Sequence, residues 1–203
     1  MNADQIWEEY ARNRRLSGRA MLSLKAMLRE AQDPYSAITL AGDTAAFQLA
    51  HEIATHLKSA DPMVRWNATG VLFTRLRDVR SATLCLELLA TEEDSMVLGI
   101  ALRGAGELSP LIDDRELQGR LVLKLWRVFR GDESELPQVP PHVREWMREE
   151  AYRGIEAAVG IPPLDRAPAN VELDMAKDVR GDVLADFHRT YGLELPEERG
   201  GIG

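Results

Sequence analysis

The chain contains a single cysteine, Cys85, among its 203 residues. One cysteine excludes an internal disulfide framework and is typical of a reducing compartment. No stretch approaches the roughly 18 consecutive apolar residues that a membrane-spanning helix requires. The first residues also lack the basic and apolar segments of a secretory signal peptide. We therefore expect a soluble cytoplasmic protein that does not bind a membrane.

Positive charge is also scarce. Lys and Arg number 25 against 33 Asp and Glu, which gives a formal net charge of −8. Proteins that bind nucleic acid without regard to sequence neutralise many phosphates with Lys and Arg. The charge balance argues against nucleic acid as a partner. It is compatible with a basic protein partner, because fields of opposite sign steer the encounter.

Motifs for metal or covalent chemistry are absent or misplaced. His51 and His56 are five residues apart, so on a helix they point in directions roughly 140° apart. The zinc-protease helix needs a spacing of four, which places both imidazoles on one face. Cys85 has no adjacent His, Lys or Arg that would activate its thiol, which favours a small core residue. The sequence therefore predicts no cofactor, no metal site and no enzymatic activity.

The apolar residues that are present follow the helical period, and strand-like alternation is nearly absent. We expect Gly42-Asp43 to open a helix with the apolar stripe Ala46, Phe47, Ala50, Ile53, Ala54 and Leu57. Asp61 can cap the next helix, and Pro62 suits its first position. That helix has the stripe Val64, Ala68, Val71, Leu72 and Leu76. So short a connection predicts an αα-hairpin over residues 43–76.

Two further hairpins follow. Ser81 is expected to cap a buried helix over residues 81–90, and a second helix over residues 97–108 contains glycines that allow close approach: Gly99, Gly104 and Gly106. These glycines do not follow a strand, so they do not form a phosphate-binding loop. Asp114 is expected to open the third hairpin, whose second helix starts at Pro141 after a long loop, Gly131 to Pro140.

An internal repeat links the second helices. Residues 61–68 align with residues 94–101 at an offset of 33, and the aligned copies share Asp, Met, Val and Ala at four positions. The pattern Asp-x-x-Val-Arg-x-x-Ala at residues 61–68 resembles the second helix of a HEAT repeat. The second copy has Leu98 in place of Arg, and the segment near Val143-Arg144 has Pro140 and Met147 where Asp and Ala belong.

The resemblance covers residues 43–159 and is best at 43–108. It implies an all-α fold, an α-α superhelix of HEAT-like hairpins with non-repeat helical ends. An offset of 33 is shorter than the usual HEAT spacing of about 40, and an ordinary helical bundle is the alternative. Some HEAT-like proteins are DNA glycosylases with a basic groove, and others are di-iron hydroxylases with several His-Glu dipeptides. This chain has little positive charge in its repeats and only one such dipeptide, His51-Glu52.

The organisation that we predict is one structural domain in three parts. Residues 1–42 form an N-terminal helical cap with helices within 3–31 and a break near Gly18. Its arginines alternate with Glu8, Glu9 and Glu30, which favours a solvated helix face. Residues 43–159 form the hairpins. Residues 160–203 form a linker, a helix around Met175 to Tyr191 and a frayed tail over residues 197–203.

Two surfaces are candidates for binding. The turns of a hairpin array lie along one edge, which would line up an acidic rim: Asp61, Glu92, Glu93, Asp94, Asp132, Glu133 and Glu135. Helix capping explains Asp61 and Asp94 equally well. It explains the other members of the rim less well, because they precede the caps, and both interpretations stay open for them. The second surface is aromatic, with Trp66, Phe73 and Trp146 as anchors on the concave side. Packing between repeats is the alternative for these three.

We therefore expect a non-catalytic scaffold that binds a basic protein, for example an immunity or antitoxin-like protein that blocks a basic toxin. A HEAT-like enzyme or nucleic-acid-repair protein and a structural subunit of a larger assembly are the alternatives.

Overall fold

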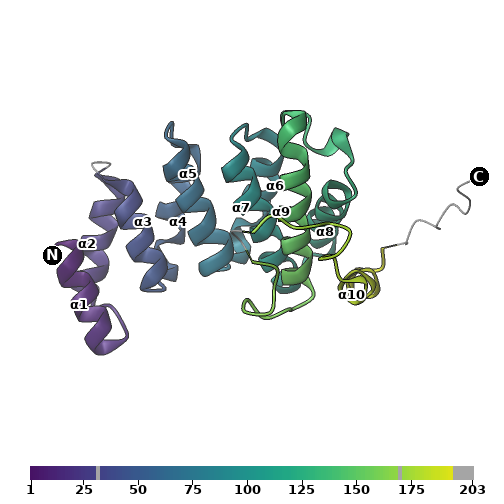
Figure 1. The fold of residues 1–203 in the computed structure, drawn as a ribbon. Coiled ribbons are helices and arrows are strands. Elements are labelled where there is room, and N and C mark those ends of the chain that lie inside the picture. The colour runs from purple at the N-terminus through teal and green to yellow at the C-terminus, as the bar shows by residue number, and fades with distance from the viewer. Residues whose placement is uncertain (31–32, 169–170, 194–203) are drawn as a thin grey trace, which may run out of the picture.

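The computed structural model describes residues 1–30, 33–168 and 171–193, and this part of the chain is helical without a strand (Figure 1). The prediction of an all-α fold is confirmed. The predicted tail, 197–203, lies outside the described residues. Within the described ranges, no helix is both long and apolar enough to cross a bilayer.

The α-helices are α1 (Ala3–Asn13), α2 (Gly18–Arg29), α3 (Pro34–Asp43), α4 (Ala50–Thr55), α5 (Pro62–Thr69), α6 (Ala82–Thr91), α7 (Ser95–Leu108), α8 (Arg115–Phe129), α9 (Arg144–Ala158) and α10 (Gly181–Tyr191). Short 3₁₀ segments flank α4 at Phe47–Leu49 and His56–Lys58, and a π-helical segment, Gly70–Arg75, continues α5. The break between α1 and α2 lies close to the predicted Gly18, at Arg14, which has a positive φ of 56°.

Successive helices pack in two layers. In one layer α3, α5, α7 and α9 each contact the next, and in the other α2 contacts α4 and α6 contacts α8. The two layers meet within the pairs α2–α3, α4–α5, α6–α7 and α8–α9. Figure 1 shows these pairs side by side from the N-terminal end to α8 and α9, with α10 beyond them. The connections within α4–α5 and α6–α7 are short, and a longer loop joins α8 to α9. Because successive pairs lie side by side, the turns within the pairs lie at the same edge.

Aspartate caps fix where three of these helices begin. Asp61 accepts from the backbone N–H of Met63 (2.9 Å), and Pro62 occupies the first turn of α5. Asp94 accepts from Met96 N (2.9 Å) at the start of α7, and Asp114 caps α8 in the same manner. These helix starts were predicted and are confirmed.

The expected start of the first hairpin is wrong. Gly42 and Asp43 end α3 and do not open the next helix. Ala45 follows with a positive φ of 50°, and the helical segment begins only at Phe47. Helix α3 was not predicted, although its start carries the same signal as that of α5, with Asp33 as the cap and Pro34 at the first position.

Ser81 occupies the N-cap position of α6, as predicted, but its side chain makes no capping hydrogen bond. Its hydroxyl donates to Asp78 (2.9 Å), and a 3₁₀ turn, Val79–Ser81, leads into the helix. In the third hairpin, the loop contains a 3₁₀ turn at Glu133–Glu135, and a second one at Pro141–Val143 precedes α9. The C-terminal helix is shorter than predicted because residues 175–180 do not belong to it.

The closest packing joins α7 to α9, the pair of helices with the most extensive contact. A Cβ at Gly106 would overlap the backbone carbonyl of Gly154, and a Cβ at Gly154 would lie 2.6 Å from the carbonyl oxygen of Leu102. The two backbones therefore touch, which only glycine permits. Gly104 faces the Phe73 side chain in the same way. The prediction that the α7 glycines allow close approach is confirmed.

Replacing Gly106 with Ala should destabilise the fold by about 3 kcal/mol or more, because the added methyl group has no space and the backbone must shift. Gly119→Ala is the matched control, since Gly119 lies in α8 with nothing within 4 Å of its would-be Cβ. It should stabilise the protein by up to about 1 kcal/mol through helix propensity. Urea denaturation followed by circular dichroism measures both. Equal effects of the two substitutions would contradict the packing described here.

Candidate functional site

The turns that precede α5, α7 and α9 lie along one edge and are tied together by side chains. Arg65 at the start of α5 pairs with Glu92 before α7 (Nε to Oε2, 2.7 Å). Gln138, in the loop before α9, donates to the carbonyl of Glu92 (3.0 Å). These contacts hold the three turns together, and of the predicted rim residues Glu92 takes part in them.

Glu92 serves the fold and is not free for a partner. It is buried, with two hydrogen bonds from Arg65 and two from the backbone N–H groups of Glu93 and Asp94. Burial raises the pKa of the Glu92 carboxyl, but the Arg65 guanidinium and the backbone donors outweigh it and hold the pKa below its ordinary value. The assignment of Glu92 to a partner-binding rim is corrected accordingly.

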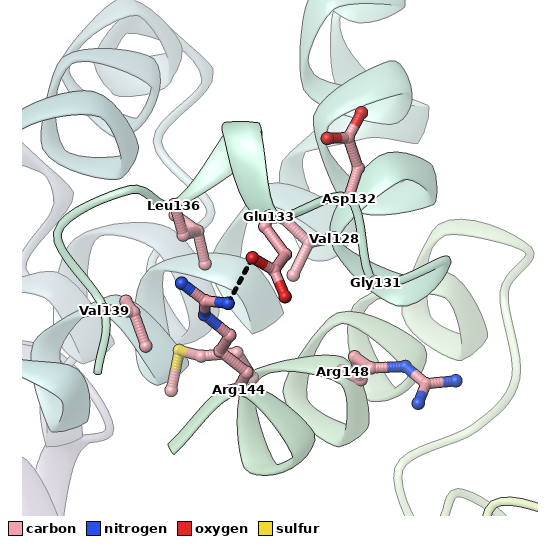
Figure 2. Close-up of a pocket in the computed structure, with 9 residues that line it drawn as sticks. Val128, Gly131, Asp132, Glu133, Leu136, Val139, Arg144 and Arg148 are labelled. Atoms are coloured by element: carbon pink, nitrogen blue, oxygen red, sulfur yellow. Dashed lines mark ion pairs between the residues drawn. The ribbon is translucent and has the colours of Figure 1, made fainter. Parts of the chain in front are cut away.

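The loop before α9 neutralises its own acids. Glu133 pairs with Arg144 (2.5 Å), as Figure 2 shows, and Asp132 accepts from the backbone and the hydroxyl of Ser134. Beneath them lies a cavity of about 30 Å³ whose apolar lining includes Val128 and Leu136. Such a volume holds at most a water molecule. This part of the loop packs against α9 and offers no ligand site.

The remaining rim acids differ in their environment. Glu135 pairs with Lys124 (3.1 Å) and Arg127 (3.0 Å). Glu93 is exposed and makes no ion pair with any described residue. Because Glu92, Glu133 and Glu135 already pair with a cation, the rim as predicted does not present a continuous negative surface.

Of the three predicted aromatic anchors, only one borders an open space. Phe73 is 0% exposed and packs under α7, so its proposed contact with a partner is wrong. Trp66 is half-buried against the core. Trp146 is also half-buried, and a Cβ at Gly99 would lie 2.9 Å from its ring. Trp146 therefore rests on α7, in the space that a glycine leaves.

Trp146 lines a hollow of about 410 Å³, which we call the Trp146 hollow. It lies between the first turns of α9 and the segment that follows α9, and its lining residues are His142, Glu145, Trp146, Glu149, Arg153, Val171 and Glu172. Three carboxylates and one guanidinium face the same space. The hollow is therefore acidic.

The guanidinium of Arg153 is already occupied. It donates to the carbonyls of Pro168 (2.8 Å) and Val171 (2.7 Å), which hold the segment after α9 against that helix. Its Nη1 also contacts Glu150 (3.1 Å) and Glu149 (3.4 Å). Arg153 therefore positions the wall of the hollow and has little capacity left for a ligand.

A second hollow, of about 250 Å³, lies on the other side of Arg153. Arg103 and Arg166 line it, but each already binds a buried carboxylate: Arg103 pairs with Glu150, and Arg166 pairs with Glu107. Guanidiniums that are already neutralised do not make a strong anion site. The Trp146 hollow is the better candidate.

Glu52 of the His-Glu dipeptide and the nearby His56 hold α4 and the 3₁₀ turn after it against α2, whereas His51 is exposed. Glu52 pairs with Lys25 (2.6 Å) and Arg29 (3.3 Å), and His56 donates from Nε2 to the carbonyl of Leu28 (2.8 Å). In the part of the chain that the structure describes, no group of three or more His, Cys, Asp or Glu residues could hold a metal.

Burial also raises the pKa of the Cys85 thiol and of the Glu156 carboxyl, and neither group lines one of the hollows described above. Cys85 lies in the core as predicted. The Glu156 carboxyl accepts from the backbone N–H of Ala167 (3.0 Å). Both side chains are buried, so neither can reach a substrate.

Sequence reasoning identified Trp146 but missed the carboxylates around it. Glu145 and Glu149 are one helical turn apart, a spacing that places side chains on one face. That signal was available once α9 was predicted. Glu172 comes from a segment without a periodic pattern, so no local signal placed it opposite α9.

No protein-family model, curated protein or solved structure matches the chain. Its function is therefore argued from its own geometry.

Replacing Glu92 with Gln should cost about 2 kcal/mol of stability, because it leaves the Arg65 guanidinium without its charged partner. Glu93→Gln, one residue along, is the control and should change stability by less than about 0.5 kcal/mol. Since the folded-state pKa of Glu92 is lowered, its contribution is present above the ordinary carboxyl pKa and is lost as the pH falls through the folded pKa.

The stability difference between the wild type and Glu92→Gln should therefore shrink in acid. Urea titrations at neutral and acidic pH measure it. A difference that does not change with pH would show that the carboxylate charge is not what holds this edge.

Proposed function

We propose that the protein is a non-catalytic binding module for a protein partner with a basic surface. The observation that carries this proposal is the Trp146 hollow, where three carboxylates and an aromatic ring face a space whose one guanidinium is already bound. A tryptophan in a partly desolvated site is a frequent anchor of protein interfaces. The net charge of −8 acts in the same direction by attracting cationic surfaces.

The edge formed by the starts of α5 and α7 could add apolar contact with the same partner. Met63 and Met96 occupy the same position in the two copies of the repeat and are 47% and 50% exposed. The other three shared positions serve capping and the core, whereas the methionines do neither. Met96 lies on α7, three residues before Gly99, the residue that Trp146 covers. Methionine adapts its shape to a partner at little cost.

The described ionisable groups support a non-catalytic role. The strongly buried carboxylates Glu92, Glu107 and Glu150 hold arginines that stabilise the helix layers. An immunity or antitoxin-like role against a basic toxin in the cytoplasm is a narrower form of this proposal. It predicts that the captured partner is an enzyme that the chain inhibits.

A charge reversal tests the proposal. Glu145→Lys with Glu172→Lys should weaken the binding of basic proteins by about tenfold or more, because like charges now face each other. Glu8→Lys with Glu87→Lys makes the same change in net charge at exposed positions of α1 and α6. Affinity capture from lysate at low and high salt, with quantitative mass spectrometry, compares the two variants with the wild type.

Proteins of high isoelectric point that the wild type and the α1/α6 variant retain, and that the hollow variant loses, would support the proposal. Equal retention by all three chains at every salt concentration would refute it.

A further inference from the structure

We infer that the Trp146 hollow is a recognition pocket for a single arginine side chain of the partner. The inference rests on the proposed function and adds the chemical group that is recognised. The Trp146 ring would provide the stacking face, and Glu149 with Glu172 would provide the acceptors.

Glu149 is the first reason. It is 3% exposed, yet its only hydrogen bond to a described residue is a long one, from Arg153 Nη1 at 3.4 Å. The same Nη1 atom lies closer to Glu150, at 3.1 Å. Buried carboxylates ordinarily accept several hydrogen bonds. No Glu149 oxygen is both fully buried and without a partner among the described residues, so the oxygen that lacks a protein donor remains accessible. Glu149 therefore keeps acceptor capacity, and it lines the hollow.

Glu150, the next residue, has the full set of hydrogen bonds that Glu149 lacks. It accepts two bonds from Arg103 and one from Arg153, and its side chain is 0% exposed. The fold thus supplies one arginine fork to Glu150 and none to Glu149. A guanidinium that enters from outside would complete the second site in the same way as the first.

The other walls favour a planar cation. Glu145 and Glu149 are one turn apart on α9, Trp146 lies between them in the sequence, and Glu172 belongs to the opposite wall. Glu145 is partly engaged by Arg148 (2.8 Å), but Glu145 is exposed and Arg148 only half-buried, so that pair is weak.

A guanidinium presents five N–H donors in a plane, which match a carboxylate edge to edge and leave its face free to stack on an indole. A lysine ammonium has no such plane and is more strongly hydrated. The hollow should therefore prefer arginine to lysine. The volume of about 410 Å³ accommodates the side chain with some water around it.

The test uses the full chain and three short peptides that differ in one residue: acetyl-Gly-Arg-Gly-amide, its lysine analogue and its uncharged citrulline analogue. The ¹H–¹⁵N signal of the Trp146 indole, identified with Trp146→Phe, reports binding. We expect a saturable shift with the arginine peptide. The lysine peptide should bind about fivefold more weakly, and the citrulline peptide should cause no shift.

Glu149→Gln should weaken the binding of the arginine peptide by about tenfold, because it removes a charged acceptor. Glu93→Gln, the matched control at the exposed turn before α7, should leave it unchanged. Glu172 is exposed, so Glu172→Gln tests the pocket without disturbing the core. It should weaken binding even if Glu149→Gln fails to fold, which circular dichroism would reveal.

Equal affinity for arginine and lysine peptides, no shift of the Trp146 signal, or unchanged binding in the Glu172→Gln variant would overturn the inference. These outcomes are separable from the test of the proposed function. If the charge-reversed hollow loses basic proteins while the peptides show no arginine preference, basic-protein binding stands and arginine recognition falls. If neither capture nor peptide binding depends on the hollow, both fall.

Discussion

The backbone contact between Gly106 and Gly154 is the constraint on which the C-terminal half of the structure depends. It seats α9 directly on α7, so that α9 is buried on nearly every side even though it carries several charged residues. Arg103 of α7 can reach Glu150 of α9 only because the two helices lie so close. The same closeness lets Trp146 lie over Gly99 and fixes one wall of the hollow. The packing of small residues therefore determines where the charges can meet.

The sequence predicted a helix start correctly where one local interaction, an aspartate cap, determines it. Asp61, Asp94 and Asp114 begin helices because an aspartate cap satisfies free backbone N–H groups regardless of tertiary context. Gly42-Asp43 failed because a glycine and an acid occur at both ends of helices, and only the packing of α3 against α5 decides between the two. The start of α3 at Asp33 and Pro34 was readable but missed.

The candidate site was predictable only in part, and the reason is distance along the chain. The common edge of the turns followed from the hairpin pattern. Its charge pairing did not, because Glu92 finds its cation 27 residues away, and that contact depends on tertiary packing. Trp146 could be singled out by its residue type. The wall that contains Glu172 could not, because Arg153 holds it through the carbonyls of Pro168 and Val171, which carry no side-chain signature.

The hydrogen bonds that link Arg65 and Gln138 to Glu92 also affect how the protein unfolds. Arrays of helix pairs in which each pair touches only its neighbours can lose their pairs one at a time from an end. Here the α6–α7 turn accepts bonds from the elements on both sides of it. Opening either neighbour removes a partner from Glu92, so the cost is shared across the three pairs. The centre of the array should therefore open as one cooperative block, with the α1–α2 end free to open earlier.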